Sequence, residues 1–482
     1  MTTARRPLHL TDEGFRDGPQ SLWSSRMSTD TMVDAAPLVD RVGYEKSLVV
    51  SGATFESAVV HLREDPWARI DAVTRLMPHT PAAAQIRGRT LFGWQQFPDD
   101  VVELFVRTLA RHGIRWLLIY DALNDMRQIE HHVRVAHSCG IEVTVPVCHT
   151  VSPVHTDDVQ REVVRRAAAL GVSRVSLLDA SGLLSAESAR ALIGVAQEEL
   201  AGSATRLEMN VHDLTGRAAE CYDVALACGV DVLAGVPRAV SYGRSIPSVE
   251  DVVATADRHD RPLDVDRAAI AEVDAYFDWA AHVEGRPRPR STRMTDAEIE
   301  AFTRHQIPGG MMSNLVAQLT ALGVADRLGE ILEEAARVRA ELGHPVMVTP
   351  CSQMVGVQAT LNVVSGERYA SSPVELRNYL AGMYGRPAGK IAPDVLDRVL
   401  GDDPEIDPYE RFARPFLPAF RDEHGAFDSD EDLLLAVLYS EAALAEFRRE
   451  QVPTRTRPRR PETALVAELI TRMAPRRLQV RL

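Results

Sequence analysis

The sequence LEMNVHDLTG, residues 207–216, puts three polar side chains, Glu208, Asn210 and His212, at alternate positions of one segment. The segment follows a polar turn and is typical of a short β-strand, in which residues two apart lie on the same face. A row of polar groups on one face is unusual for a strand that is packed into a core. We therefore expect this strand to be apolar where it crosses the core and polar where it reaches a functional site.

Seven other apolar, β-rich segments occur along the same part of the chain. Amphipathic stretches separate them, such as DDVVELFVRTLARHG (99–113) and TDDVQREVVRRAAALG (156–171), and both of these end in the glycine that often follows a helix. The eight predicted strands are Leu8–Phe15, Lys46–Gly52, Ala82–Gly88, Ile114–Leu123, Ile141–Thr150, Ser173–Gly182, Thr205–Asp213 and Val230–Val236.

Alternation of eight strands with helical crossovers favours an α/β fold of the (β/α)₈ type, the TIM barrel. An open doubly wound sheet is the alternative, but it would favour a glycine-rich phosphate loop after the first strand, and TDEGFRDGPQS (11–21) is not such a loop. After residue 262 the β pattern stops and helical patterns follow. We expect a barrel domain over 1–262, an α-helical C-terminal domain over 263–450, and an Arg- and Pro-rich tail over 451–482 that is solvated or reaches a neighbouring subunit.

Composition and charge exclude several classes of protein. The 482-residue chain is 45% hydrophobic and 25% charged, as in ordinary globular proteins, and its net charge of −14 argues against a nucleic-acid partner. No apolar run approaches the ~20 residues that span a bilayer, and MTTARRPLHL (1–10) lacks the apolar stretch of a signal peptide. The five cysteines are scattered without a C-x-x-C pair. We therefore expect a reduced cytoplasmic protein with no membrane role.

The ends of the predicted strands carry polar residues. In (β/α)₈ barrels, residues at the C-terminal ends of the strands perform the chemistry. Single Asp or Asn residues at such ends often only cap the next helix, but here polar groups follow most of the strands. The candidate site residues are Arg16, Asp17, Arg87, Asp121, Asn124, His149, Asp179, Ser181, Asn210 and His212.

Nine short motifs then occur in one order: FRDGPQS, SGATFES, EDPWARI, IRGRTLFGW, DALND, SPVHT, IPGGMMSNL, VTPCSQMVG and YGRP. With them the chain resembles the carboxyltransferase component of biotin-dependent enzymes, the family of pyruvate carboxylase, the oxaloacetate decarboxylase α chain and transcarboxylase. The resemblance covers roughly residues 8–393, and IPGGMMSNL and EDPWARI are particular to this branch. It implies a barrel whose site is completed by a helical funnel domain, and barrels that pair into a homodimer.

The resemblance also implies the residues of the site. The family adds or removes CO₂ at the carbon next to the ketone of a 2-oxo acid, which requires a cradle for the substrate carboxylate, a cation for the enolate and a proton relay to biotin. Arginine suits the cradle because its planar fork grips a carboxylate at two points. The motif matches are Arg16 for the cradle, with Gln20 and Arg87 near it, Thr349 for the relay, with Ser352 near it, and Trp94 where relatives usually carry tyrosine.

The metal site that the resemblance implies is only half present. Its ligands in the family are the Asp of the RD motif, a carbamylated lysine and two histidines spaced H-x-H. Asp17 and His212 match this set, but Leu178 stands at the lysine and Asn210 at the first histidine. Lys46, one of only two lysines, begins the second predicted strand, so we expect it at the opposite end of the barrel.

Several interpretations of this half-site stay open. His149, with Asp17 and His212, would make a three-ligand site for a divalent metal, or it only hydrogen-bonds across the pocket. A Mg²⁺ ion on Asp17 and substrate oxygens is another interpretation. In a metal-free pocket, Arg16, Arg87 and protonated His212 would carry the enolate charge.

Three functions are consistent with these features. The first is a carboxyltransferase acting on a pyruvate- or oxaloacetate-like 2-oxo acid. Because no biotinyl segment surrounds Lys46 or Lys390, carboxybiotin would arrive on a separate carrier protein. The second is a biotin-independent decarboxylase or carbon–carbon lyase, and the third is a non-catalytic homologue. Schiff-base chemistry is set aside because no lysine is placed for it.

Overall fold

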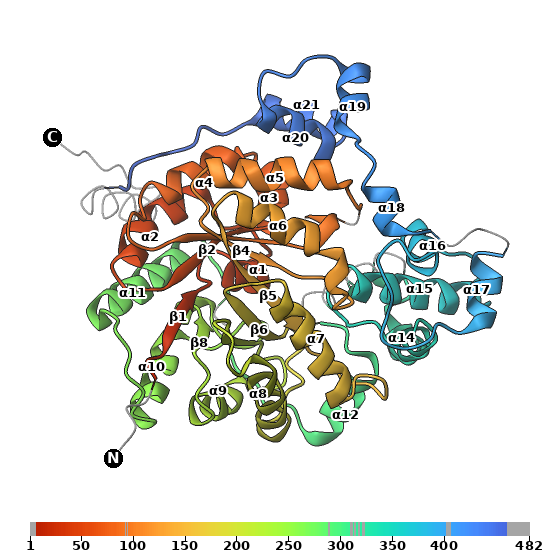
Figure 1. Ribbon diagram of the computed structural model, residues 1–482, viewed down its shortest axis with the longest axis horizontal. Coiled ribbons are helices and arrows are strands. Elements are labelled where there is room, and N and C mark those ends of the chain that lie inside the picture. Colours follow the sequence, from red (N-terminus) through yellow and green to blue (C-terminus); the bar gives the residue numbers. More distant parts are fainter. Residues whose placement is uncertain are drawn as a thin grey trace.

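The barrel predicted from the sequence is confirmed in a computed structural model of the chain, in which eight parallel strands close in the order β1 to β8 (Figure 1). The structure describes residues 6–91, 93, 95–287, 290–308, 312, 315–316, 319–320, 323–401 and 406–459. The strands are β1 His9–Asp12, β2 Lys46–Ser51, β3 Ala82–Ile86, β4 Trp116–Ile119, β5 Glu142–Cys148, β6 Arg174–Asp179, β7 Arg206–Val211 and β8 Val232–Gly235.

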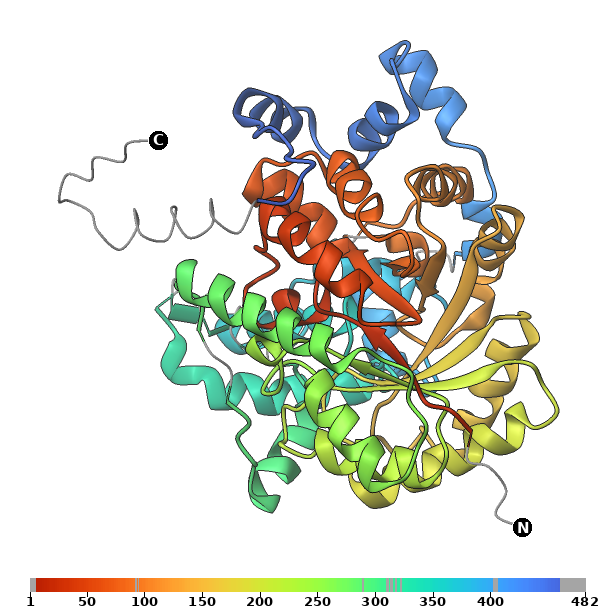
Figure 2. The ribbon, with the colours of Figure 1, turned by 90° about the vertical axis from the view of Figure 1, so that its left-hand side faces the viewer.

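Helices surround this barrel, and side-chain caps begin many of them. Ser51 and Ser185, for example, each accept a hydrogen bond from the backbone N–H three residues ahead. In Figure 2, α11 lies beside α2 on the outside of the barrel. The helices of this part are α1 Asp17–Leu22, α2 Thr29–Asp40, α3 Gly52–Ser57, α4 Pro66–Thr74, α5 Asp99–Arg111, α6 Glu130–Ser138, α7 Asp157–Ala169, α8 Ala186–Leu200, α9 Ala218–Ala227, α10 Val249–Arg258 and α11 Arg267–Val283.

The C-terminal part is helical, and its helices pack into two different cores. Residues of α14 to α18 form a second hydrophobic cluster at one side of the barrel (Figure 1). Phe277 of α11, Leu434 of α20 and Phe447 of α21 instead belong to the main barrel cluster. The division of the chain at residue 262 therefore remains a proposal. The helices are α12 Asp296–His305, α14 Leu328–Glu341, α15 Cys351–Ser365, α16 Val374–Leu380, α17 Pro393–Val399, α18 Pro408–Phe412, α19 Leu417–His424, α20 Asp430–Leu438 and α21 Glu441–Glu450.

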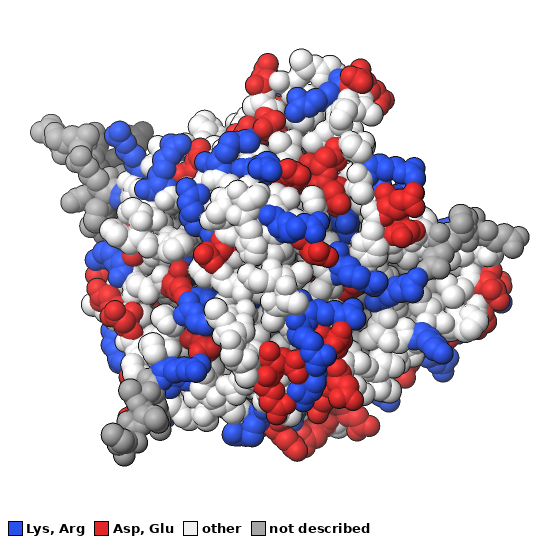
Figure 3. Space-filling view, viewed as in Figure 1, with Lys and Arg blue, Asp and Glu red and all other residues white. Residues whose placement is uncertain are grey.

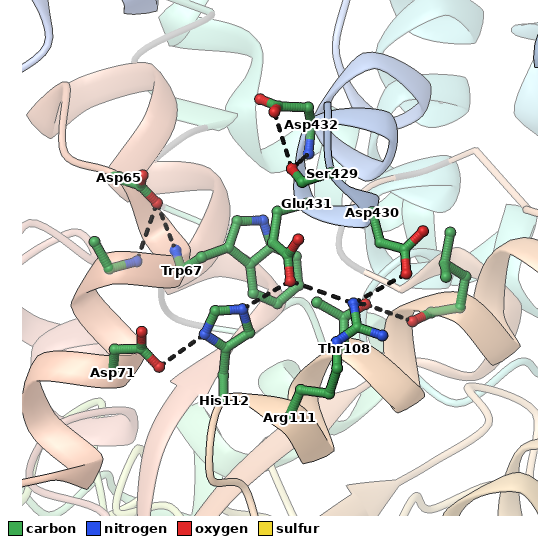
Figure 4. A network of polar contacts seen from close by, with 12 residues as sticks. Asp65, Trp67, Asp71, Thr108, Arg111, His112, Ser429, Asp430, Glu431 and Asp432 are labelled. Atoms are coloured by element: carbon green, nitrogen blue, oxygen red, sulfur yellow. Dashed lines mark hydrogen bonds and ion pairs between the residues drawn. The ribbon is translucent and has the colours of Figure 1, made fainter. Parts of the chain in front are cut away.

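The start of α20 is fastened to the barrel helices by a polar network (Figure 4). The His112 ring stacks on Trp67 with 5.1 Å between the centroids, and its two nitrogens contact Asp71 at 2.8 Å and Glu431 at 3.0 Å. Arg111 pairs with Asp430 at 3.1 Å. These contacts join residues more than 300 positions apart in the sequence and hold the last helices against α4 and α5.

The segment 451–459 is attached to α2 by ion pairs, although most of its residues are exposed to solvent. Arg455 donates to Asp34 at 2.6 Å and pairs with Asp30 at 3.1 Å, and Arg459 donates to Asp30 at 3.0 Å. The backbone N–H of Val452 donates to the carbonyl of Arg63 at 2.7 Å. Acidic residues near the start of α2 therefore attract the first arginines of the C-terminal segment.

The barrel interior is polar well below the strand ends, which corrects the expectation that β7 is apolar where it crosses the core. Glu208 pairs with Lys46 at 2.5 Å, and both side chains are almost fully buried. The Lys46 ammonium lies 4.7 Å from the centroid of Trp116, and the Arg174 guanidinium lies over the same ring at 4.6 Å. Lys46 is the first residue of β2, as predicted, and lies at the amino end of the barrel.

No helix in the described ranges is both long and apolar enough to cross a membrane. Charged residues of both signs are mixed over the face seen in Figure 3. Over α7 and α8, for example, Arg161 and Arg165 pair with Glu198 and Glu199. The pairing neutralises much of the positive charge on that surface locally.

Candidate active site

A cavity of about 530 Å³ opens at the carboxyl ends of the barrel strands. Both the barrel and the helical part contribute to its wall. The lining residues used below are Arg16, Asp17, Gln20, Gln85, Tyr120, Leu178, Ala180, His212, Val348 and Thr349. The structure therefore brings Arg16, Asp17, Gln20, His212 and Thr349 together from distant parts of the sequence.

Arg16 is held at the cavity floor by two acids. Its Nη1 donates to Glu13 Oε2 at 2.6 Å and to Asp17 Oδ1 at 2.9 Å, and only 7% of the residue is exposed. Within the described part of the chain, the Nη2 group makes no hydrogen bond. Since Arg16 lines the cavity, Nη2 is the part of the guanidinium that a ligand can use.

Asp17 and His212 form an ion pair. The His212 Nε2 lies 3.1 Å from Asp17 Oδ1, and its Nδ1 donates to the carbonyl of Arg244 at 2.8 Å. Burial opposes the charged form of Asp17, but His212 and Arg16 outweigh it and lower the pKa of Asp17 to about 2. Burial likewise opposes the charged form of His212, and Asp17 outweighs it and raises the pKa of the imidazole. Both ring nitrogens of His212 are therefore occupied by protein acceptors.

Glu13 is a functional candidate that the sequence reasoning did not identify. It is 1% exposed, and burial raises its pKa to about 7 against the opposing effect of Arg16. Its Oε1 accepts a hydrogen bond from Asn210 Nδ2 at 2.8 Å. Asn210 thus contacts the acid that holds Arg16, and it does not line the cavity. The alternation of Glu208, Asn210 and His212 on one face was the only sequence signal for this contact.

The other residues that we predicted to contact the substrate do not all lie at the cavity. Gln20 Oε1 accepts a hydrogen bond from Ser51 at 2.7 Å, and Thr349 lines the cavity. Ser352 is fully buried, and its hydroxyl has no partner among the described residues. Arg87 donates to the carbonyl of Gly93 at 3.3 Å and does not line the cavity. Trp94 lies outside the described residues.

The donors present do not fit the metal site of the family. Leu178 packs in an apolar cluster with Tyr120, Cys148 and Val348 at the wall of the cavity. An aliphatic side chain offers no ligand, and the Asn210 amide is already bonded to Glu13. Among the described residues, no three His, Cys, Asp or Glu side chains are grouped so that they could hold a metal ion.

His149 does not join Asp17 and His212, so the three-ligand site considered from the sequence is not formed. Cys148 belongs to the apolar cluster with Leu178, and the next residue along an extended chain points to the opposite side. Both ring nitrogens of His149 are buried without a hydrogen-bond partner among the described residues. Burial lowers the pKa of His149, and its nearest charged influence is Asp179.

The architecture and the pocket together define a class of protein: a (β/α)₈ barrel with a cavity at the carboxyl ends of its strands, where enzymes of this fold have their active sites. Similar proteins specify the class further. A family model described as "Conserved carboxylase domain" matches residues 302–472. A pyruvate carboxylase subunit of Methanothermobacter thermautotrophicus is 33% identical over 470 residues, which cover 96% of this chain and 81% of that protein.

The 2-oxoglutarate carboxylase large subunit of Hydrogenobacter thermophilus is 34% identical over 403 residues, 84% of this chain and 61% of that subunit. Among solved structures, the carboxyl transferase domain of Rhizobium etli pyruvate carboxylase with pyruvate has a TM-score of 0.83 at 23% identity. It covers 93% of this chain and 77% of that one, and it shows the shared fold. The chain belongs to the family of carboxyltransferase components of biotin-dependent enzymes, which confirms the resemblance seen in its motifs, and it is an enzyme of this carboxyl-transferring class.

Proposed function

We propose that the protein moves CO₂ between carboxybiotin, held on a separate carrier protein, and the carbon next to the ketone of a 2-oxo acid. The observation that carries this proposal is the joint placement of Arg16, Gln20, His212 and Thr349 around one cavity at the barrel mouth. A volume of about 530 Å³ admits a small pyruvate- or oxaloacetate-like acid together with part of a second reactant. As in its relatives, we propose that the enzyme is a homodimer.

Arg16 has the role of binding the substrate carboxylate in this proposal. Its Nη2 makes no hydrogen bond to any described residue, while Glu13 and Asp17 both accept from Nη1 and hold the guanidinium in place. The fixed position matters because an arginine that is already oriented loses little rotamer freedom when a ligand binds. Gln20 would add a donor beside it, because Ser51 occupies its amide oxygen and leaves the amide N–H groups.

Thr349 is the proposed proton relay. Its hydroxyl can accept a proton from the substrate carbon and donate one to the ring nitrogen of biotin, because a hydroxyl is both donor and acceptor. The residue lies between α14 and α15 of the helical part and lines the cavity, and we propose that carrier-borne biotin approaches it from that part. No step of this scheme requires a metal, which is consistent with the poor fit of Leu178 and Asn210 to a metal site.

A second candidate is biotin-independent decarboxylation of a β-keto acid. The apolar wall of Leu178, Tyr120 and Val348 beside Arg16 favours it. When CO₂ leaves, a localised carboxylate charge becomes a neutral molecule and a delocalised enolate. A wall that cannot solvate the carboxylate therefore favours the departure of CO₂. This reaction would need no carrier protein.

Release of CO₂ from oxaloacetate and other β-keto acids by the purified protein, with and without free biotin, tests both candidates. Release that depends on biotin supports carboxyl transfer, because biotin then accepts the carboxyl group. Equal release without biotin supports the decarboxylase. Absence of release across the panel, together with no change in Tm on adding the acids, would contradict both functions and leave a non-catalytic homologue.

A further inference from the structure

Tyr120 lines the cavity, and the functions proposed above use only its ring, as part of the apolar wall. It follows the last residue of β4, and it shares the inward face of that strand with Trp116, whose ring lies in the barrel interior. Its ring packs against Leu178, Cys148 and Val348 and is 8% exposed. Arg16 lines the same cavity, and the positive charges of Arg16 and Arg87 both act on the Tyr120 hydroxyl.

The hydroxyl of Tyr120 is an unused donor. In the part of the chain that the structure describes, it makes no hydrogen bond, and yet the residue lines the cavity. A buried or half-buried tyrosine hydroxyl normally finds a partner, so an unpartnered one at a pocket indicates a ligand contact. Burial also raises the pKa of Tyr120 to about 12, which keeps the phenol neutral and its proton available for donation.

The positively charged groups of the site have few N–H donors left for a ligand. His212 uses Nε2 on Asp17 and Nδ1 on the carbonyl of Arg244. Arg16 uses Nη1 on Glu13 and Asp17, and its Nη2 serves the substrate carboxylate in the proposed function. Neither His212 nor Arg16 is therefore free to donate to the keto oxygen of the substrate, and Leu178 provides no donor.

We propose that Tyr120 is a further catalytic residue, which donates a hydrogen bond to the keto oxygen of the 2-oxo acid as that oxygen becomes an enolate. The proton stays on the phenol throughout. During decarboxylation the electron pair of the carbon–carbon bond moves into the enolate, and during carboxylation the same pair attacks CO₂. In both directions Tyr120 stabilises the same charged oxygen from a low-dielectric wall. The inference rests on the proposed function.

The variant Tyr120→Phe tests this role, because it removes one oxygen and keeps the ring that packs on Leu178. We expect kcat for CO₂ release to fall about 100-fold, with KM changed less than about threefold, since the lost hydrogen bond strengthens in the transition state. The matched control is Tyr276→Phe, which removes a hydroxyl that donates to the Thr31 carbonyl at 3.0 Å outside the barrel. That variant should keep the kcat of the wild type. An unchanged kcat in Tyr120→Phe would overturn the inference.

Binding of oxalate, a planar anion that resembles the enolate of pyruvate, provides a readout without turnover. Calorimetric titration should show oxalate binding weakened about tenfold or more in Tyr120→Phe, because the donor faces a charged oxygen. Pyruvate binding should change much less. If the wild type binds oxalate and releases CO₂ but Tyr120→Phe equals it in both, only this inference fails. If the wild type does neither, the proposed function fails, and this inference fails with it.

Discussion

Arg16 illustrates how strongly the residues of this site depend on one another. It neutralises two buried acids, Glu13 and Asp17, and it lines the cavity at the same time. Removal of the whole side chain would leave both carboxylates without a cation, which carries a large desolvation penalty. A loss of binding in Arg16→Ala would therefore combine loss of the cradle with local rearrangement of the acids.

The variant Arg16→Lys separates these effects, because it keeps the positive charge and loses only the planar fork. We expect binding of a 2-oxo acid to weaken by about tenfold or more, since an ammonium lacks the fixed geometry that lets the guanidinium bind both acids through Nη1 and direct Nη2 at the substrate. The control is Arg26→Lys, an exposed arginine at the rim of the same cavity, which should bind as the wild type does. Calorimetric titration with pyruvate or oxaloacetate measures both. Wild-type affinity in Arg16→Lys would exclude Arg16 as the carboxylate cradle.

For single residues, the sequence predicted which ones lie at the site better than it predicted what each one does there. Arg16, Asp17, Gln20, His212 and Thr349 were all predicted at the site and all line the cavity. The sequence also allowed His212 to donate to the enolate. The structure does not favour that role, because Nε2 contacts Asp17 and Nδ1 donates to the carbonyl of Arg244. Tyr120 was not predicted because a tyrosine at the end of an apolar strand is commonly a core residue.

At the scale of the element, β7 is the most informative strand. Its inward face carries Glu208 at the floor of the barrel, Asn210 in the middle and His212 at the mouth. Their charged partners are Lys46 on β2, Glu13 in the loop after β1 and Asp17 at the start of α1, respectively. The period of two predicted that these side chains share a face. It did not predict the depth at which the polar row begins, because that depends on Lys46 from another strand.

The buried pair of Lys46 and Glu208 gives a stability prediction at this scale. In Lys46→Met we expect the free energy of unfolding to fall by about 3 kcal/mol, because Glu208 stays buried without its closest cation. Arg174 Nε lies 3.6 Å from Glu208 and limits the loss. The matched control is Lys390→Met, which changes the other lysine of the chain at an exposed position and should alter stability by less than about 0.5 kcal/mol.

Thermal unfolding followed by circular dichroism measures these differences. A second variant, Lys46→Met combined with Glu208→Gln, should recover part of the lost Tm, since the unpaired charge is then gone as well. Equal Tm values for Lys46→Met and Lys390→Met would contradict a stabilising role of the buried pair.

On the scale of the whole molecule, the C-terminal helices and the segment after them return to the barrel. The His112 and Arg111 network fastens α20 to α4 and α5, and Arg455 fastens residues 451–459 to α2 (Figures 1 and 4). The helical part with the second core precedes both of these returns in the sequence and contributes Thr349 and Val348 to the cavity. It is flanked by α11 before it and α20 after it, and both of these helices pack in the main barrel core.

The attachment of the last segment can be tested with trypsin, which cleaves after Arg455. In the variant Asp30→Asn with Asp34→Asn, we expect this cleavage to become about fivefold faster, because the lost ion pairs are partly exposed and contribute about 1 kcal/mol together. CO₂ release should not change, since neither acid lines the cavity. The control is Asp257→Asn, which breaks the pair with Arg267 elsewhere on the barrel and should leave cleavage at Arg455 unaltered. Equal cleavage rates in all three proteins would show that these ion pairs do not hold the segment.

The sequence by itself determined the architecture, the family and several of the residues that line the cavity, among them Arg16, Asp17 and His212. Eight strand patterns with helical crossovers leave few topologies, and strand ends of a parallel barrel must meet at one rim whatever the packing details. The sequence also predicted that two metal ligands of the family are missing, because Leu178 stands at the position of the lysine and Asn210 at that of the first histidine.

Only the tertiary structure decided which of those groups is free to act. Hydrogen-bond partners come from different strands, so the pairing of Asn210 with Glu13, of His212 with Asp17 and of Lys46 with Glu208 has no signature in the spacing of one segment. A donor serves a substrate only if no protein acceptor already holds its proton. By that physical criterion both nitrogens of His212 are already used, whereas Tyr120 lines the cavity with a hydroxyl that bonds no described residue.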